Sequence, residues 1–169
     1  WEGSLTNPAF SEEVLTATAR VATEDTSAAL ILRSNGTDSA YVFSFNNALD
    51  ELFILGFGPT RSHCTPLGCG DVLARPAFPI SEDTDYILQA SVFGSSLAFR
   101  VWEASGSIPA VPQLAATDGV LTQGSFGMSI SRYALATPTA PIAGSFDNVS
   151  FVPEPTTGLL QGLGLLGVA

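Results

Sequence analysis

Residues 86–102 read YILQASVFGSSLAFRVW, and the alternation in this stretch decides the fold. Apolar side chains occupy every second position on both sides of Gly94-Ser95-Ser96, namely Tyr86, Leu88, Ala90 and Val92 before it, and Leu97, Phe99 and Val101 after it. A period of two places these side chains on one face of a β-strand. The stretch therefore predicts an antiparallel hairpin with one buried face.

The same alternation recurs on both sides of this hairpin. Ser34-Asn35-Gly36-Thr37 marks a second hairpin turn, because Asn-Gly accepts positive φ angles at low cost. Residues 50–57 are apolar enough to be covered on both faces, whereas the Pro- and Gly-rich residues 58–80 predict an excursion over the surface. The predicted strands are 1–6, 14–21, 28–33, 38–46, 50–57, 86–93, 97–102, 114–116, 124–133 and 144–152.

About ten to twelve short strands without a helix before residue 153 predict an all-β fold, an antiparallel β-sandwich over residues 1–152. Its core is expected to take up most of the aromatic side chains. We assign to it Phe43, Phe45, Phe99, Phe126 and Phe151.

The chain has 169 residues, with no Lys, six Arg and sixteen acidic residues, and its formal net charge is −10. Nucleic acids and anionic membranes are bound by positive surfaces, so this charge argues against both as partners. Calcium or a neutral glycan fits the composition better.

Cys64 and Cys69 are the only cysteines, and Pro66 and Gly68 between them supply a turn. An even number of cysteines in an exported chain favours a disulfide, which would brace the loop locally. The alternative is a metal site formed with His63, but no fourth ligand lies nearby in the sequence. We therefore predict the disulfide.

Residues 153–169 form a separate C-terminal segment. Pro153-Glu154-Pro155 is a rigid joint, and the uncharged apolar run that follows is predicted to be helical. Residues 158–169 are too few to cross a bilayer, which takes roughly 20 residues. We therefore expect this segment to bury its apolar side chains against other copies of the chain. These side chains are Leu159, Leu160, Leu163, Leu165, Leu166 and Val168.

Val152-Pro153-Glu154-Pro155, followed by a short polar step and the Leu/Gly-rich run, resembles the start of the PEP-CTERM sorting signal of exported bacterial proteins. The resemblance implies an extracellular or cell-surface location and processing by an exosortase. Members of that family have a longer apolar helix that ends in an Arg cluster, which this sequence lacks. We therefore expect a membrane as a partner only if the natural tail is longer. If the protein is exported, we expect its signal peptide to have been removed already.

Residues 13–152 resemble the concanavalin A-like, laminin G-like jelly roll. The resemblance rests on the alternation of residues 86–102, on Thr117-Asp118-Gly119, and on the final Phe146-Asp147-Asn148-Val149. It implies two antiparallel sheets packed face to face, often with a structural calcium and often with glycans bound on a concave face.

No catalytic set emerges from the sequence. A glycosidase needs two nearby carboxylates, but Asp50 and Glu51 point to opposite faces of a strand, and Asp83 and Asp85 lie at an ordinary strand start. His63, the only histidine, has no nucleophile motif beside it. We therefore expect no enzyme activity.

Two sets of residues are candidates for ligand contact. Asp147 and Asn148 offer oxygen ligands to calcium, although they fit equally well as side chains that cap a turn. Trp102 and Tyr133 are candidates for stacking on sugar rings.

The sequence alone favours a non-enzymatic exported structural protein of the cell surface or extracellular matrix, which assembles into a homo-oligomer or filament through its C-terminal segment. The alternative is a calcium-dependent, lectin-like glycan-binding module, and the third interpretation is a glycosidase. A groove lined by Trp102 and Tyr133, or an ion at Asp147, would favour the lectin.

Overall fold

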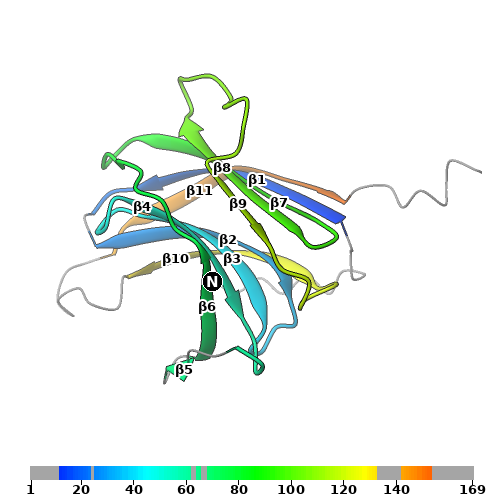
Figure 1. The fold of residues 1–169 in the computed structure, drawn as a ribbon. Helices are drawn as coiled ribbons and strands as arrows, with labels where there is room; N and C mark the ends of the chain where they lie inside the picture. Colours follow the sequence, from blue (N-terminus) through cyan, green and yellow to red (C-terminus); the bar gives the residue numbers. More distant parts are fainter. Residues whose placement is uncertain (1–11, 24, 62–63, 66–67, 133–141, 154–169) are drawn as a thin grey trace, which may run out of the picture.

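The computed structural model describes residues 12–23, 25–61, 64–65, 68–132 and 142–153. Within them two antiparallel sheets pack face to face (Figure 1). The five-stranded sheet has the order β11-β1-β7-β8-β9 and the six-stranded sheet the order β10-β2-β3-β4-β6-β5. The strands are β1 (Glu12–Val21), β2 (Thr26–Ser34), β3 (Ala40–Asn46), β4 (Glu51–Phe57), β5 (Cys64–Thr65), β6 (Gly68–Ala74), β7 (Asp85–Phe93), β8 (Ser96–Glu103), β9 (Leu114–Thr117), β10 (Ser125–Arg132) and β11 (Gly144–Pro153).

The predicted all-β sandwich is confirmed, and the alternation that defines it points each strand's apolar residues toward the facing sheet. The residues predicted to alternate in β7 and β8, Phe99 among them, are all buried in one core cluster, which also contains Phe43 and Phe45. Phe43 lies 5.8 Å from Phe99 between ring centroids, so the aromatic side chains join the two sheets.

The β10 and β11 edges of the two sheets meet through a stacked aromatic pair. The rings of Phe126 and Phe151 lie 4.2 Å apart between centroids at an interplanar angle of 17°. Both side chains pack against the core cluster and are partly buried, as the prediction of core positions requires. The pair closes one side of the sandwich.

The prediction of a surface excursion over residues 58–80 is wrong for part of that range. Residues 68–74 form β6, which pairs antiparallel with β4 in the six-stranded sheet. A Cβ added at Gly70 would lie 2.9 Å from the Phe57 ring, so the glycines that looked like loop residues permit close packing of the strand on its neighbour. Cys64 lies opposite Cys69 in the β5–β6 ladder, but the side chains of both lie outside the described residues, so the disulfide stays a prediction.

Other predictions concern residues that the structure does not describe. These are the strand at 1–6, Tyr133, the metal alternative at His63, and the assembly segment Leu159 to Val168. Among the described residues there is no helix with the length and hydropathy needed to cross a membrane.

Candidate functional site

The outer faces of the two sheets differ in what they expose. On the six-stranded sheet, the outward positions at one end of the central strands are nearly inaccessible: Asn46, Ala29, Ser44 and Phe53 are 3, 4, 8 and 9% exposed. The next outward row, Ile31, Val42 and Leu55, is half-buried and apolar. The Arg75 guanidinium carbon lies 5.2 Å from the centre of the Phe53 ring, and Arg75 Nη2 lies 2.6 Å from Glu51 Oε2. This face therefore presents few polar side chains to a ligand in its middle.

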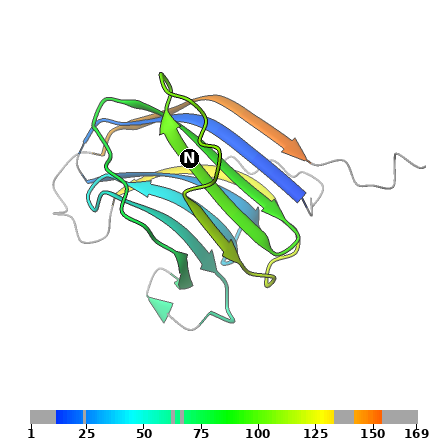
Figure 2. The ribbon, with the colours of Figure 1, turned by 45° about the horizontal axis from the view of Figure 1, so that its top comes forward.

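The outer face of the five-stranded sheet is open and polar. Its strands β11, β1, β7, β8 and β9 lie side by side in Figure 2. Because Leu15, Leu88 and Phe99 point inward, the residues that follow them in the sequence, Thr16, Gln89 and Arg100, point outward. The register places these three side chains directly opposite one another across β1, β7 and β8.

Hydrogen bonds join this polar row, which we define as Thr16, Gln89 and Arg100. Arg100 Nη1 donates to Gln89 Oε1 at 2.9 Å, and Gln89 Nε2 donates to Thr16 Oγ1 at 3.4 Å. The arginine thereby orients the Gln89 amide, with its oxygen toward β8 and its nitrogen toward β1. All three side chains are half-buried, so they are positioned yet accessible from one side.

The rows on either side of the polar row differ in size. On one side lie the small residues Ser91, Ala98 and Ala115, which are paired in register. On the other side lie Thr18, Ile87 and Trp102. The polar row therefore borders short side chains on β7, β8 and β9, and on β1 that neighbouring row continues with Val14.

Trp102, the candidate for stacking on a sugar, lies on this same outer face but is only 8% exposed. It is also not a member of the core cluster between the sheets. Its indole ring therefore offers little area for stacking in this conformation. Trp102 lies two residues after Arg100 on β8, and thus next to the polar row on the same face.

Asp147 and Asn148, the calcium candidates, lie on β11 at a bulge opposite Thr18. Asn148 has a φ of 49°, its backbone N–H donates to Asp147 Oδ1 at 2.7 Å, and its Nδ2 donates to Thr18 Oγ1 at 3.4 Å. Among the described residues, no group of three or more His, Cys, Asp or Glu side chains could hold a metal ion. These contacts match the interpretation of the pair as turn-capping side chains.

The carboxylates on this face do not form a glycosidase pair. Asp85 accepts two hydrogen bonds from Arg20, at 2.7 and 2.8 Å, and Arg20 lowers the pKa of Asp85. A carboxylate held ionised in this way is a poor general acid. Asp83, two residues earlier, has a φ of 55° and precedes the strand.

The carboxyl with the most perturbed pKa lies where no substrate can reach it. Glu13 is 0% exposed, points between the sheets, and has no hydrogen-bond partner for either carboxylate oxygen. Burial raises the pKa of Glu13 to about 7, while the positive charge of Arg33 acts in the opposite direction. Sequence reasoning missed Glu13 because a charged residue at an inward position contradicts the alternation.

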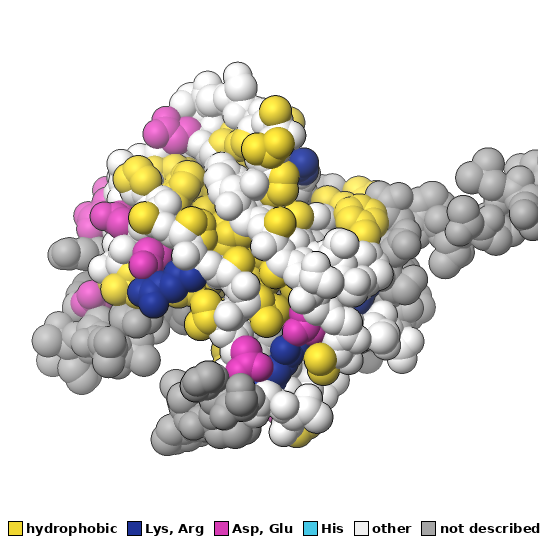
Figure 3. All heavy atoms as spheres, in the orientation of Figure 1, with side chains coloured by type: hydrophobic (Ala, Val, Ile, Leu, Met, Phe, Trp, Pro, Cys, Tyr) yellow, Lys and Arg dark blue, Asp and Glu magenta, His cyan; other side chains and the backbone are white. Residues whose placement is uncertain are grey.

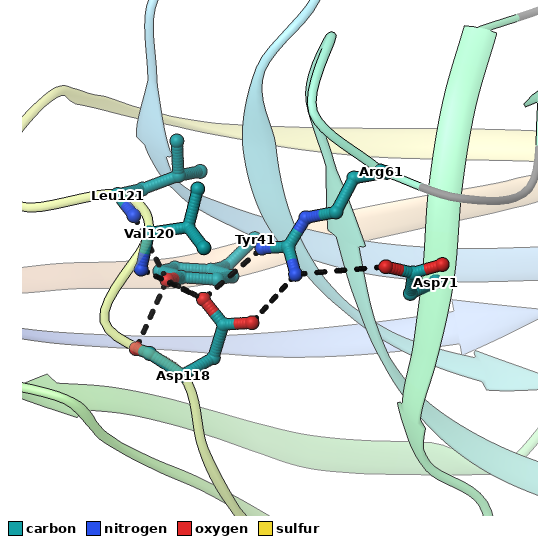
Figure 4. A network of polar contacts seen from close by, with 6 residues as sticks. All are labelled: Tyr41, Arg61, Asp71, Asp118, Val120 and Leu121. Atoms are coloured by element: carbon teal, nitrogen blue, oxygen red, sulfur yellow. Dashed lines mark hydrogen bonds and ion pairs between the residues drawn. The ribbon is translucent and has the colours of Figure 1, made fainter.

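A second buried network links the two sheets (Figure 4). Arg61 donates to both carboxylate oxygens of Asp118, at 2.6 and 3.1 Å, and Tyr41 Oη lies 2.5 Å from Asp118 Oδ1. Burial raises the pKa of Asp118, but the hydrogen bonds from Arg61, Tyr41 and the Val120 N–H outweigh it and lower the pKa to about 2. Because the carboxylate is held by the protein itself, we assign the network to the fold.

No protein-family model matches the sequence, and no curated protein matches it. Solved structures do match. The carbohydrate-binding module CBM66 from Bacillus subtilis is 18% identical, with a TM-score of 0.63 over 85% of this chain and 76% of that chain. A Bacillus subtilis protein of unknown function with a galectin-like fold is 12% identical, with a TM-score of 0.58 over 86% of this chain and 73% of that one.

Sheep galectin-11, in complex with glycerol, is also 12% identical, with a TM-score of 0.52 over 88% of this chain and 100% of that chain. Identities this low show the fold alone, which is a jelly-roll β-sandwich of the galectin-like type.

Proposed function

We propose that this protein is a lectin-like carbohydrate-binding module without catalytic activity, and that it binds glycans on the polar row of its five-stranded sheet. The observation that carries the proposal is the open row of an amide, a hydroxyl and a guanidinium, on a fold shared with a carbohydrate-binding module and a galectin. Such groups form the directional hydrogen bonds that orient a polar ligand. The lectin interpretation therefore takes precedence over a purely structural role.

The test is a glycan array probed with the full chain, followed by calorimetry on the best ligand. We expect Arg100→Ala to weaken binding about 10- to 100-fold, because a hydrogen bond from a charged donor contributes roughly 1.5–3 kcal/mol. Gln89→Ala should weaken binding as well, since it removes the group that holds the guanidinium.

Arg75→Ala is the matched control, because it removes an arginine from the outer face of the other sheet. It should leave the affinity within about twofold of the wild type. Loss of binding in Arg75→Ala with retention in Arg100→Ala would move the site to the six-stranded sheet. An array without any ligand for the wild type would reject the proposed function.

A second experiment tests whether glycan binding depends on calcium bound at Asp147. Because its carboxylate already accepts the Asn148 N–H, we expect EDTA to leave glycan binding unchanged. Loss of binding on chelation, restored by calcium, would revive the calcium-dependent interpretation.

We further propose export to the cell surface or extracellular space, with residues 153–169 serving as a sorting or assembly segment. The motive is the Pro-Glu-Pro joint and the uncharged apolar run after it. Deletion of residues 156–169 should lower the assembly size in light scattering and retain the glycan affinity. An unchanged assembly size would remove the filament hypothesis without affecting the lectin.

A further inference from the structure

We propose that Arg100 recognises a carboxylate on the glycan, so that the preferred ligand carries a single acidic sugar among neutral ones. This inference rests on the proposed function and specifies its ligand class. The first observation behind it is which side chains the arginines of this acidic chain bind.

Three of the six arginines pair with a carboxylate among the described residues. Arg20 pairs with Asp85 at 2.7 Å, Arg61 with Asp118 at 2.6 Å, and Arg75 with Glu51 at 2.6 Å. Arg100 is different, because no carboxylate among the described residues pairs with it. Arg33 donates instead to the carbonyl oxygens of Gly94 and Leu121, but it is nearly inaccessible. Arg100 is half-buried, and its guanidinium is bound by the neutral amide of Gln89.

The surroundings of Arg100 on the outer face are neutral. Its neighbours across the sheet and along β8 are Gln89, Ala98 and Trp102. The nearest ion pair on this face, Arg20 with Asp85, lies four residues along β7 from Gln89, which corresponds to about 13 Å. Figure 3 shows one side of the molecule, on which most of the surface is uncharged and dark-blue basic side chains are few.

The guanidinium also keeps unused hydrogen-bonding capacity. Arginine has five N–H donors, and one of them is bound by Gln89 Oε1. Its Nε is buried and out of reach of a ligand, so the donors that remain for a ligand are those of the two Nη atoms. A planar, oriented guanidinium with free donors matches the geometry of a carboxylate, whose two oxygens accept parallel N–H bonds.

The net charge of −10 limits how many carboxylates the ligand can carry. A polyanion would be repelled by the protein as a whole, whereas the interaction of one carboxylate with one arginine is local. At physiological salt, charges more than about 8 Å away are largely screened. An isolated uronic acid flanked by neutral sugars satisfies both conditions.

The test compares two ligands that differ in this charge, an oligosaccharide of neutral sugars that ends in one glucuronic acid and the neutral methyl ester of the same oligosaccharide. We expect the wild type to bind the acid about 10- to 100-fold more tightly than the ester, since charged hydrogen bonds are the stronger ones. The preference should shrink as NaCl is raised from 50 to 500 mM.

Two variants assign the preference to Arg100. Arg100→Gln should bind acid and ester equally, and Gln89→Glu should lose the preference because it supplies a competing carboxylate within the protein. Arg20→Gln, on the same face but already paired with Asp85, should keep it.

Equal affinities of the wild type for acid and ester would overturn this inference and leave the proposed function in place. Binding to neither ligand nor to any other glycan would reject the proposed function itself. A preference that survives in Arg100→Gln would place the carboxylate elsewhere.

Discussion

Arg61 and Arg33 are both buried, at 8 and 1% exposure, and each carries its charge close to a carboxyl group, yet those two carboxyl groups have opposite pKa shifts. The pKa of Asp118, beside Arg61, is lowered to about 2, and that of Glu13, near Arg33, is raised to about 7. Both carboxyls have lost most of their contact with water. Burial raises both pKa values, and only at Asp118 do side-chain hydrogen bonds outweigh it.

The donors around the two carboxyl groups account for the difference. Asp118 accepts from Arg61, Tyr41 and the Val120 N–H. Arg33 instead donates from its guanidinium to the carbonyl oxygens of Gly94 and Leu121, at 2.7 and 2.6 Å, and no side chain donates to Glu13. Burial therefore outweighs the charge and the backbone hydrogen bond of Arg33, which both lower the pKa of Glu13.

The largest effect is expected for Asp118→Asn, which removes the carboxylate that Arg61 binds. The carboxylate that then remains near Arg61 is that of Asp71, 3.8 Å away. Breaking one side of a buried ion pair costs roughly 3–5 kcal/mol of unfolding free energy. Urea denaturation at pH 7 measures it. Asp71→Asn is the control and should cost much less, because its carboxylate is farther away and 26% exposed. Equal costs would contradict the assignment of Asp118 as the main partner.

Glu13→Gln should stabilise the protein at pH 8 and change little at pH 5. The folded-state pKa of Glu13, about 7, lies above the ordinary value of 4.5, so the unfolded chain releases this proton at lower pH. Stability therefore falls as pH rises from about 4.5 to 7, by on the order of 3 kcal/mol in total. Glutamine mimics the protonated group and removes this loss. Urea midpoints measured from pH 5 to 8 test it.

Asp118 provides the opposite slope as an internal comparison. Its folded-state pKa is lowered, so its contribution is present above the ordinary value of 3.8 and is lost as pH falls toward 2. A wild-type profile that is flat between pH 5 and 8 would show that Glu13 is not the buried, unpaired acid described above.

The fold could be predicted from the sequence because alternation is local. The burial of Leu88, Ala90 and Phe99 can be predicted from the polar residues that alternate with them, and the structure confirms it. The burial of Arg33 cannot, because its φ of 52° breaks the alternation and turns a charged side chain inward after Leu32. No rule of residue type predicts that conformation at an arginine.

The polar row was missed for a different reason. Thr16, Gln89 and Arg100 each occupy an outward position that the pattern identifies, but their meeting depends on a register between β1 and β7, whose paired residues Thr16 and Gln89 are 73 positions apart. Nothing near Thr16 in the sequence specifies that register. The same holds for Tyr41 and Asp118, which are 77 positions apart.

Gly124→Ala should destabilise the Arg33 region by roughly 1–3 kcal/mol, the usual cost of forcing an extra group into a packed site. A Cβ at this position would lie 2.3 Å from the Arg33 carbonyl carbon and 2.6 Å from its Cα. Backbone atoms cannot turn aside as a side chain does, so β2 or the β9–β10 connection must shift. Thermal denaturation measures the cost, and a wild-type midpoint would contradict the close approach.

Gly56→Ala is the matched change in the other region and should have the smaller effect. Its Cβ would lie 2.6 Å from Arg61 Nη2, the far end of a long side chain that can move. Moving it weakens the bonds to Asp118, so the cost of Gly56→Ala should nearly vanish in an Asp118→Asn background. A double-mutant cycle measures this coupling. Additive costs would mean that Gly56 serves the packing of β4 against β6 and that the Arg61–Asp118 pair does not depend on it.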